Sequence, residues 1–159
     1  MPGLDRSRGD PAYVCGRLLA ILSRIQAKAM SANSDAEKER RLSANVVSRY
    51  YGAASSRPAT GLYLPLRMRI HHLNKLDRDD PWAAIGLRKE LQETCSLVDI
   101  DTLPRTLSPA QQCVFAIGFE HQMAEFFRPR KPPIDGTAVS NEIKMLTGQS
   151  DNQTTERNA

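Results

Sequence analysis

Three helix-start signals constrain this chain more than any other feature of its sequence. Asp10, Asp80 and Ser108 each stand directly before a proline. Such side chains accept hydrogen bonds from the free amides of a helix's first turn, and proline is tolerated in that turn. After each pair, apolar residues recur at the spacing of a helix. The sequence therefore predicts helices from Pro11 to about Met30, from Pro81 to about Val98 and, opened by a capping box of Ser108 and Gln111, from Pro109 to about Phe127.

The middle of the chain predicts two further helices. A short one is expected over residues 44–51, ended by Gly52 in a left-handed conformation. The polar, charged linker 31–43 before it is compatible with some helix, but little of it is expected to belong to a core. Apolar residues then resume at helical spacing over 62–76. Because the ring of Pro65 would clash inside a helix, this helix either kinks at Pro65 or begins there.

The segment from Arg49 to Ala59 fits no generic loop, because it combines two tyrosines with a run of small residues. Small residues permit close backbone approach, so we expect this segment to pack against another element. Tyr51 is interpreted as a core or interface aromatic, and Tyr50 is left open. Alternatively, Tyr50, Tyr51 and Tyr63 can stack on unpaired bases, since every base has a face that an aromatic ring can cover.

No segment shows the pattern of a β-strand, so the sequence predicts an all-α fold. With 159 residues and 40% hydrophobic content, the chain is long enough for one modest core. We predict a bundle of about four to five helices over residues 10–128, preceded by a flexible N-terminus over 1–9. The stretch 129–159 is rich in proline and then in small polar residues, which predicts a mostly disordered tail.

Cysteine usage and hydropathy indicate the compartment. Cys15, Cys95 and Cys113 are odd in number and far apart, which is typical of small buried residues in a reducing environment. We find no signal peptide, and no apolar run reaches the roughly 20 residues that span a bilayer. The sequence predicts a soluble, cytoplasmic protein without a membrane partner.

The residues that carry chemistry do not form a catalytic or metal-binding pattern. His71 and His72 are adjacent, so on a helix they point about 100° apart and cannot share a metal. His121 stands in an aromatic helix, where a packed or hydrogen-bonded histidine is the simpler interpretation. The sequence contains no paired Cys or His ligands, no glycine-rich phosphate loop and no nucleophile elbow. We therefore predict a non-enzyme with no metal site and no cofactor.

The charge of the chain is divided unevenly. The formal net charge is +4, but residues 1–78 carry 14 Lys and Arg against 6 Asp and Glu, whereas residues 79–159 carry 8 against 12. A basic half suggests a polyanion as partner, and the acidic half, with Asp99 and Asp101 near a helix end, is the expected side for protein neighbours. Copies of the chain that stack basic side to acidic side would form a head-to-tail array.

Two rows of cations follow helical spacing. Arg17, Arg24 and Lys28 lie within about 20° of one line on the first helix. A second row lies on the helix after Pro65 and consists of Arg67, His71, Lys75 and Arg78. The apolar residues opposite this row are Leu66, Ile70 and Leu73. Packed side by side, these helices would present a basic face to phosphates, whose contacts do not depend on base sequence. Such rows are also common on solvated helix faces, so charge alone decides nothing.

An ordered set of short motifs resembles one known family. The set consists of Asp10-Pro11-Ala12-Tyr13 with Gly16-Arg17-Leu18 and Ala20, the phrase Arg49–Ser55 with Pro58-Ala59, His71-His72-Leu73 with Lys75-Leu76, Phe115–Phe119 with His121-Gln122, and Phe126-Phe127. In this order the motifs are similar to the C-terminal helical region of the type I-C CRISPR large subunit. In that family the region is also made as a separate small subunit from an internal start. A chain that begins with Met1 and contains only this region resembles that subunit.

The resemblance implies a function and a set of partners. It implies a helical bundle in the RNA-guided surveillance complex Cascade, beside the backbone and large subunits and further copies of itself. There it lines the path of the displaced non-target DNA strand and supports the R-loop, with the crRNA–DNA heteroduplex as a further candidate partner. The residues expected to contact a nucleic-acid backbone are Arg17, Arg24, Lys28, Arg49, Arg57, Arg67, His71 and Lys75.

Two alternatives remain open from the sequence. One is that this region works only as the C-terminal domain of a longer large subunit. The other is a helical protein-interaction module with no role in nucleic-acid binding, whose basic rows are merely solvated faces.

Overall fold

The computed structural model describes residues 3–31 and 35–129, and within these ranges the chain is helical and contains no strand. The all-α prediction is therefore confirmed. The helices are α1 (Pro11–Met30), α2 (Ala36–Ser56), the single turn α3 (Pro58–Gly61), α4 (Tyr63–Asp79), α5 (Pro81–Cys95) and α6 (Pro109–Phe126), with one turn of 3-10 helix at Ile100–Thr102. The expectation of a disordered tail concerns residues that, from 130 onward, lie outside the described part of the chain.

The three predicted helix starts are confirmed at the level of hydrogen bonds. Asp10 accepts from the amide of Ala12 at 3.0 Å, and Asp80 accepts from the amide of Ala83 at 3.2 Å. At α6 both halves of the capping box form, since the Gln111 amide donates to the Ser108 hydroxyl and the Gln111 side chain accepts from the Ser108 amide. Local sequence therefore fixes where α1, α5 and α6 begin.

The predicted bounds of the second helix were wrong. Helix α2 begins at Ala36, inside the stretch interpreted as a linker, and runs through Gly52 to Ser56. Asp35 caps it and accepts from the amide of Lys38 at 2.8 Å. Gly52 lies within the helix and does not end it. The polar start of α2 is a true helix in which Glu39 pairs with Arg24 and Lys28 of α1, a partnership that a count of apolar positions cannot reveal.

Proline marks the next two starts. Pro58 opens α3. Helix α4 begins at Tyr63, two residues before Pro65, so this proline lies in the first turn of the helix, where a proline is tolerated. The buried side of α4 includes Leu66, Leu73 and Leu76. Ile70 was predicted to share this side, but it is exposed.

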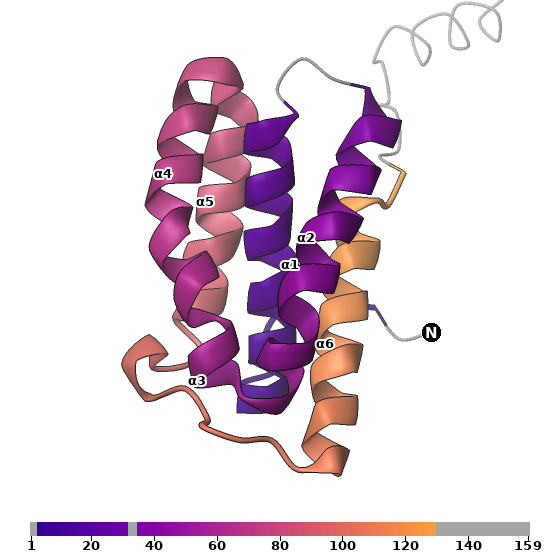
Figure 1. Ribbon diagram of the computed structural model, residues 1–159, viewed down its shortest axis with the longest axis vertical. Coiled ribbons are helices and arrows are strands. Elements are labelled where there is room, and N and C mark those ends of the chain that lie inside the picture. Colours follow the sequence, from indigo (N-terminus) through magenta and orange to yellow (C-terminus); the bar gives the residue numbers. More distant parts are fainter. Residues whose placement is uncertain (1–2, 32–34, 130–159) are drawn as a thin grey trace, which may run out of the picture. The chain divides into compact units, whose positions relative to one another are not determined.

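Helix α1 lies at the centre of the bundle, with α4 and α5 on one side and α2 and α6 on the other (Figure 1). Every residue from Ala12 to Ser23 is buried, because neighbours surround this helix. Its crossing with α6 is closest at two glycines. A Cβ on Gly16 would lie 2.0 Å from the Phe115 carbonyl oxygen, and one on Gly118 would lie 2.1 Å from the Tyr13 carbonyl oxygen. The absence of these side chains lets the two backbones touch.

The Arg49–Ala59 segment packs as predicted. Tyr51 meets Phe115 and Phe119 edge to face, with ring centroids 5.5 and 5.2 Å apart, which confirms it as a core aromatic. Close backbone approach is also confirmed, since a Cβ on Gly61 would lie 2.2 Å from the backbone nitrogen of Ala54.

The cysteines follow the prediction in part. Cys15 is buried, Cys95 is half-buried and Cys113 is exposed, so the expectation of three buried thiols was wrong for Cys113. Among the described helices, none combines the length and apolar character needed to cross a membrane.

Candidate nucleic-acid interface

The predicted row of cations on α1 does not form a surface. Arg17 is only 1% exposed and points between α5 and α6. Its Nε donates to Gln122 Oε1 and its Nη2 to Thr94 Oγ1, both at 3.0 Å, and Nη2 lies 3.5 Å from Glu90 Oε1. Burial lowers the pKa of Arg17, which the charge of Glu90 opposes. The placement of Arg17 on a basic face is therefore corrected: in this fold it holds three helices together.

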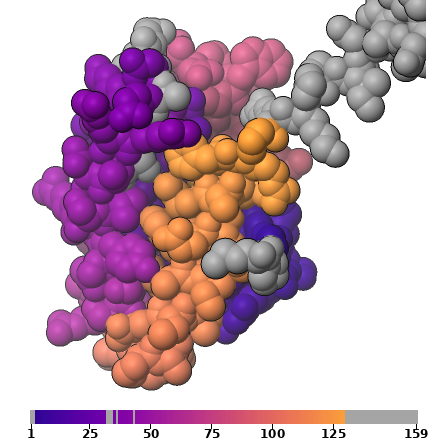
Figure 2. Space-filling view, turned by 90° about the vertical axis from the view of Figure 1, so that its right-hand side faces the viewer, coloured from indigo at the N-terminus to yellow at the C-terminus, as the bar shows by residue number. Residues whose placement is uncertain are grey.

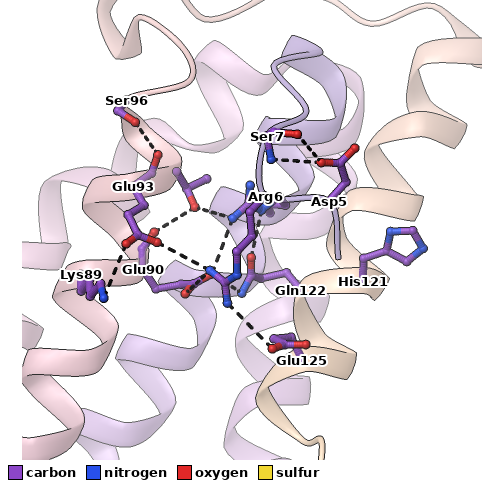
Figure 3. Close-up of polar contacts among 12 residues, drawn as sticks. Asp5, Arg6, Ser7, Lys89, Glu90, Glu93, Ser96, His121, Gln122 and Glu125 are labelled. Carbon is purple, nitrogen blue, oxygen red and sulfur yellow. Dashed lines mark hydrogen bonds and ion pairs between the residues drawn. The ribbon is translucent and has the colours of Figure 1, made fainter. Parts of the chain in front are cut away.

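The N-terminal segment covers this buried cluster. The Arg6 guanidinium binds both oxygens of Glu90 at 2.8 Å and lies 3.6 Å from Glu93 and 3.8 Å from Glu125 (Figure 3). These carboxylates raise the pKa of Arg6, with the hydrogen bond to Glu90 as the largest cause. Residues 3–9 are thus fastened to α5 and α6.

The other two cations of this row face α2 and α6. Arg24 forms an ion pair with Glu39 Oε1, and Lys28 Nζ lies 3.2 Å from Glu39 Oε2. The Arg24 guanidinium also lies 4.7 Å from the ring centroid of Phe127. Burial lowers the pKa of Arg24, opposed by Glu39. Sequence reasoning missed Glu39, because one acidic residue in a charged stretch carries no signal of burial.

Lys75 has a structural partner on the central helix. Its Nζ donates to the carbonyl oxygen of Ala29, in the last turn of α1, and also lies 2.8 Å from Asp79 Oδ2. A cation at this position satisfies a carbonyl that the end of α1 leaves free and matches the negative end of its dipole.

The remaining predicted residues are exposed and lie on the consecutive helices α2 to α4. We call the three arginines, Arg49, Arg57 and Arg67, the α2–α4 cations; His71 is the fourth residue and counts as neutral in the formal charge. Two of the arginines stand beside tyrosines. Arg67 donates to the Tyr63 hydroxyl at 3.1 Å, and the Arg49 guanidinium lies 5.6 Å from the Tyr50 ring centroid. None of the four forms an ion pair with a carboxylate in the described part of the chain.

Helices α2 and α6 run side by side (Figure 2). A hollow of about 450 Å³ lies between them. Its walls are mainly apolar and consist of Arg40, Ala44, Val47, Phe119, Glu120, Met123 and Phe127. The first half of α2 therefore packs loosely on α6, whereas its second half contributes the buried Ala54 and the ring of Tyr51 to the core.

No metal-binding group appears in the part of the chain that the structure describes, where no three His, Cys, Asp or Glu residues converge. His121 Nδ1 lies 3.0 Å from the Tyr13 hydroxyl, which confirms the interpretation of a hydrogen-bonded histidine. What the described surface offers is a set of cations and adjacent tyrosines, which suits contact with phosphates and bases.

A family model described as CRISPR-associated protein (Cas_Csd1) matches residues 2–127 of the chain. The match spans every described helix. No curated protein matches the chain.

Proposed function

Because the chain belongs to the CRISPR-associated protein (Cas_Csd1) family, that of the type I-C large subunit, we propose that it is a non-catalytic small subunit of the type I-C surveillance complex. In this role it holds the displaced non-target DNA strand through the phosphate backbone and stabilises the R-loop. Its proposed protein partners are other Cascade subunits and further copies of itself, and the crRNA–DNA heteroduplex is a further nucleic-acid partner.

The α2–α4 cations carry this proposal. Phosphate contacts depend on exposed positive charge and not on a base-reading element. Arg49, Arg57 and Arg67 offer such charge, and Tyr50 and Tyr63 lie beside two of them. Lys75 is 39% exposed and can contribute from the same helix as Arg67, although it also serves the end of α1.

Charge reversal tests the exposed arginines directly. Arg57→Glu with Arg67→Glu is expected to weaken target-DNA binding by a reconstituted complex, and to do so alike for all target sequences, because backbone contacts read no bases. Lys89→Glu is the control for a change of surface charge, since its side chain is 76% exposed on α5 and it is not among the residues proposed to contact DNA. Loss of binding that varied with target sequence, or equal loss in the control, would contradict the proposal.

Omission of the chain tests the role in the complex. A type I-C complex assembled without it is expected to load guide RNA normally but to form less stable R-loops at physiological salt. Unchanged R-loop stability would reject the proposed role. Detection of a stand-alone product of this size in cells would separate the small subunit from a domain that works only within the large subunit.

One observation favours the rival function of protein interaction. Trp82 is 83% exposed at the start of α5, and Ile85 stands one turn further along the same side of the helix. Exposed tryptophan is typical of interface anchors. Trp82→Ala is expected to weaken assembly with other subunits while leaving DNA contacts intact. If Trp82→Ala and the arginine reversals both spared DNA binding but impaired assembly, the interaction module would be the better description.

A further inference from the structure

Glu39 bridges two cations of α1 with one oxygen each. Oε1 pairs with Arg24 and Oε2 with Lys28, and the residue is 8% exposed. We propose that Glu39 is an internal substitute for a nucleic-acid phosphate, which masks Arg24 and Lys28 until a strand displaces it. This inference rests on the proposed function, because it adds to the proposed DNA contacts Arg24 and Lys28, which the sequence predicted to bind a backbone and which the fold pairs with Glu39.

The charge balance at this position favours an anionic ligand. One carboxylate faces Arg24 and Lys28, and a third cation, Arg40, lies 5.5 Å from the Phe127 ring that Arg24 also contacts from 4.7 Å. Two positive groups therefore share one carboxylate, and Arg40 adds a third cation at the neighbouring hollow, which the carboxylate of Glu120 also borders. A strand brings several phosphates, each with two unesterified oxygens, and can satisfy these cations better than Glu39 alone.

The attachment of Glu39 is easy to exchange, because the first half of α2 has little apolar packing. Over residues 36–46, Glu39 and Val46 are the buried residues among those whose side chains are described. Arg40 and Ala44 instead border the hollow between α2 and α6. Few apolar side chains of this half of α2 are buried, so the ion pairs of Glu39 contribute much to its attachment, and a polyanion competes for these pairs directly.

The consequence is a threshold for binding. Stray nucleic acid at low concentration must displace Glu39 before it reaches Arg24 and Lys28. A displaced strand held beside this chain in the complex is present at high effective concentration and overcomes this competition. Glu39 would thus favour the strand of an R-loop over free nucleic acid.

The test compares Glu39→Gln with Glu37→Gln in the full chain. Both remove one negative charge from the same turn of α2, but Glu37 is 64% exposed and pairs only with Arg41 among the described residues. Binding of a fluorescent oligo(dT) strand is measured over a range of salt concentrations. We expect Glu39→Gln to bind about 10-fold more tightly than Glu37→Gln, with a slope of log affinity against log salt steeper by about 1.4, or about 0.7 for each of two added phosphates.

The added variant Glu39→Gln with Arg24→Gln and Lys28→Gln is expected to lose this gain. Equal affinity and slope for Glu39→Gln and Glu37→Gln, or no binding by Glu39→Gln, would overturn the inference. The proposed function is judged separately by R-loop stability in the assembled complex, which does not require the isolated chain to bind DNA.

If Glu39→Gln fails to fold, hydrogen exchange of the unaltered chain tests whether a DNA strand displaces Glu39. Saturating oligo(dT) is expected to accelerate amide exchange over residues 36–46, because Glu39 releases its partners, while α1 and α6 keep their protection. Unchanged or slower exchange over residues 36–46 would overturn the inference.

Discussion

Arg17 and Arg24 lie two turns apart on one side of α1, yet the fold treats them differently. Arg17 is enclosed by neutral acceptors, Gln122 and Thr94, with Glu90 beyond, where α1 crosses α6 at two glycines. Arg24 is matched by the carboxylate of Glu39 next to a hollow. The N-terminal half of α1 is therefore packed tightly around Arg17, whereas its C-terminal half is joined to α2 by ion pairs with Glu39.

The two arginines show that a row of cations on a helix does not define a surface. Both arginines have the spacing of a solvated or DNA-binding face. Because other helices surround α1, Arg17 links α1 to α5 and α6 inside the protein, and Arg24 pairs with Glu39 of α2. The position of the neighbouring helices, and not the row itself, determines which cations can meet a ligand.

The largest effect is expected where the two backbones touch. Gly118→Ala places a methyl group 2.1 Å from the Tyr13 carbonyl oxygen, so α6 must shift from α1, at a cost of about 4 kcal/mol in the free energy of unfolding. Urea denaturation measures the change. Gly86→Ala is the matched control, because no atom lies within 4 Å of the position that its Cβ would take, and it should stabilise α5 by about 0.5 kcal/mol. Similar values for the two variants would refute the tight crossing.

Replacing each arginine with alanine compares how much the two side chains contribute to stability. Arg17→Ala leaves a buried void and unpaired groups on Gln122 and Thr94, which is expected to cost about 3 kcal/mol. Arg24→Ala is expected to cost less, about 2 kcal/mol, because the buried carboxylate of Glu39 keeps Lys28 as a partner. The same denaturation experiment compares them. A loss for Arg24 as large as that for Arg17 would show that the two ends of α1 are packed alike.

The hollow between α2 and α6 allows a stabilising change. Ala44→Leu adds apolar volume beside Val47 and Met123 and is expected to raise the free energy of unfolding by about 1 kcal/mol. Ala54→Leu on the same helix is the opposing case, since Ala54 is buried against Gly61 and should lose about 2 kcal/mol. Destabilisation by Ala44→Leu would mean that the first half of α2 is already close-packed.

The smallest effect concerns the thiol in the packed half. Burial raises the pKa of Cys15 to about 12 from the ordinary 9.0. The thiol of the unfolded chain ionises first as pH rises, so unfolding releases a proton and stability falls between about pH 9 and 12. Cys15→Ala should therefore show a shallower loss of stability above about pH 9 than the exposed-site control Cys113→Ala. Equal slopes would contradict the burial effect.

Local rules predicted much of the fold correctly. The capping residues and prolines placed the starts of α1, α5 and α6, and the small residues around Ala54 predicted close packing. These features depend on neighbours in sequence, which the chain itself specifies. The start of α2 was missed because Glu39 is stabilised by Arg24 and Lys28 from another helix, and Ile70 was misplaced because α4 turns a different side toward α1.

Residue patterns alone specify a helical protein, the starts of its main helices, a basic first half and, through an ordered set of motifs, a resemblance to the family that the comparison shows. Which cations are accessible depends instead on how the helices pack. Arg17 is buried, Arg24 and Lys28 pair with Glu39, and Lys75 donates to a carbonyl at the end of α1. The side chains that remain exposed are Arg49, Arg57 and Arg67. The physical reason is that a charge's role depends on its solvation and its counterion, and both are supplied by residues remote in sequence.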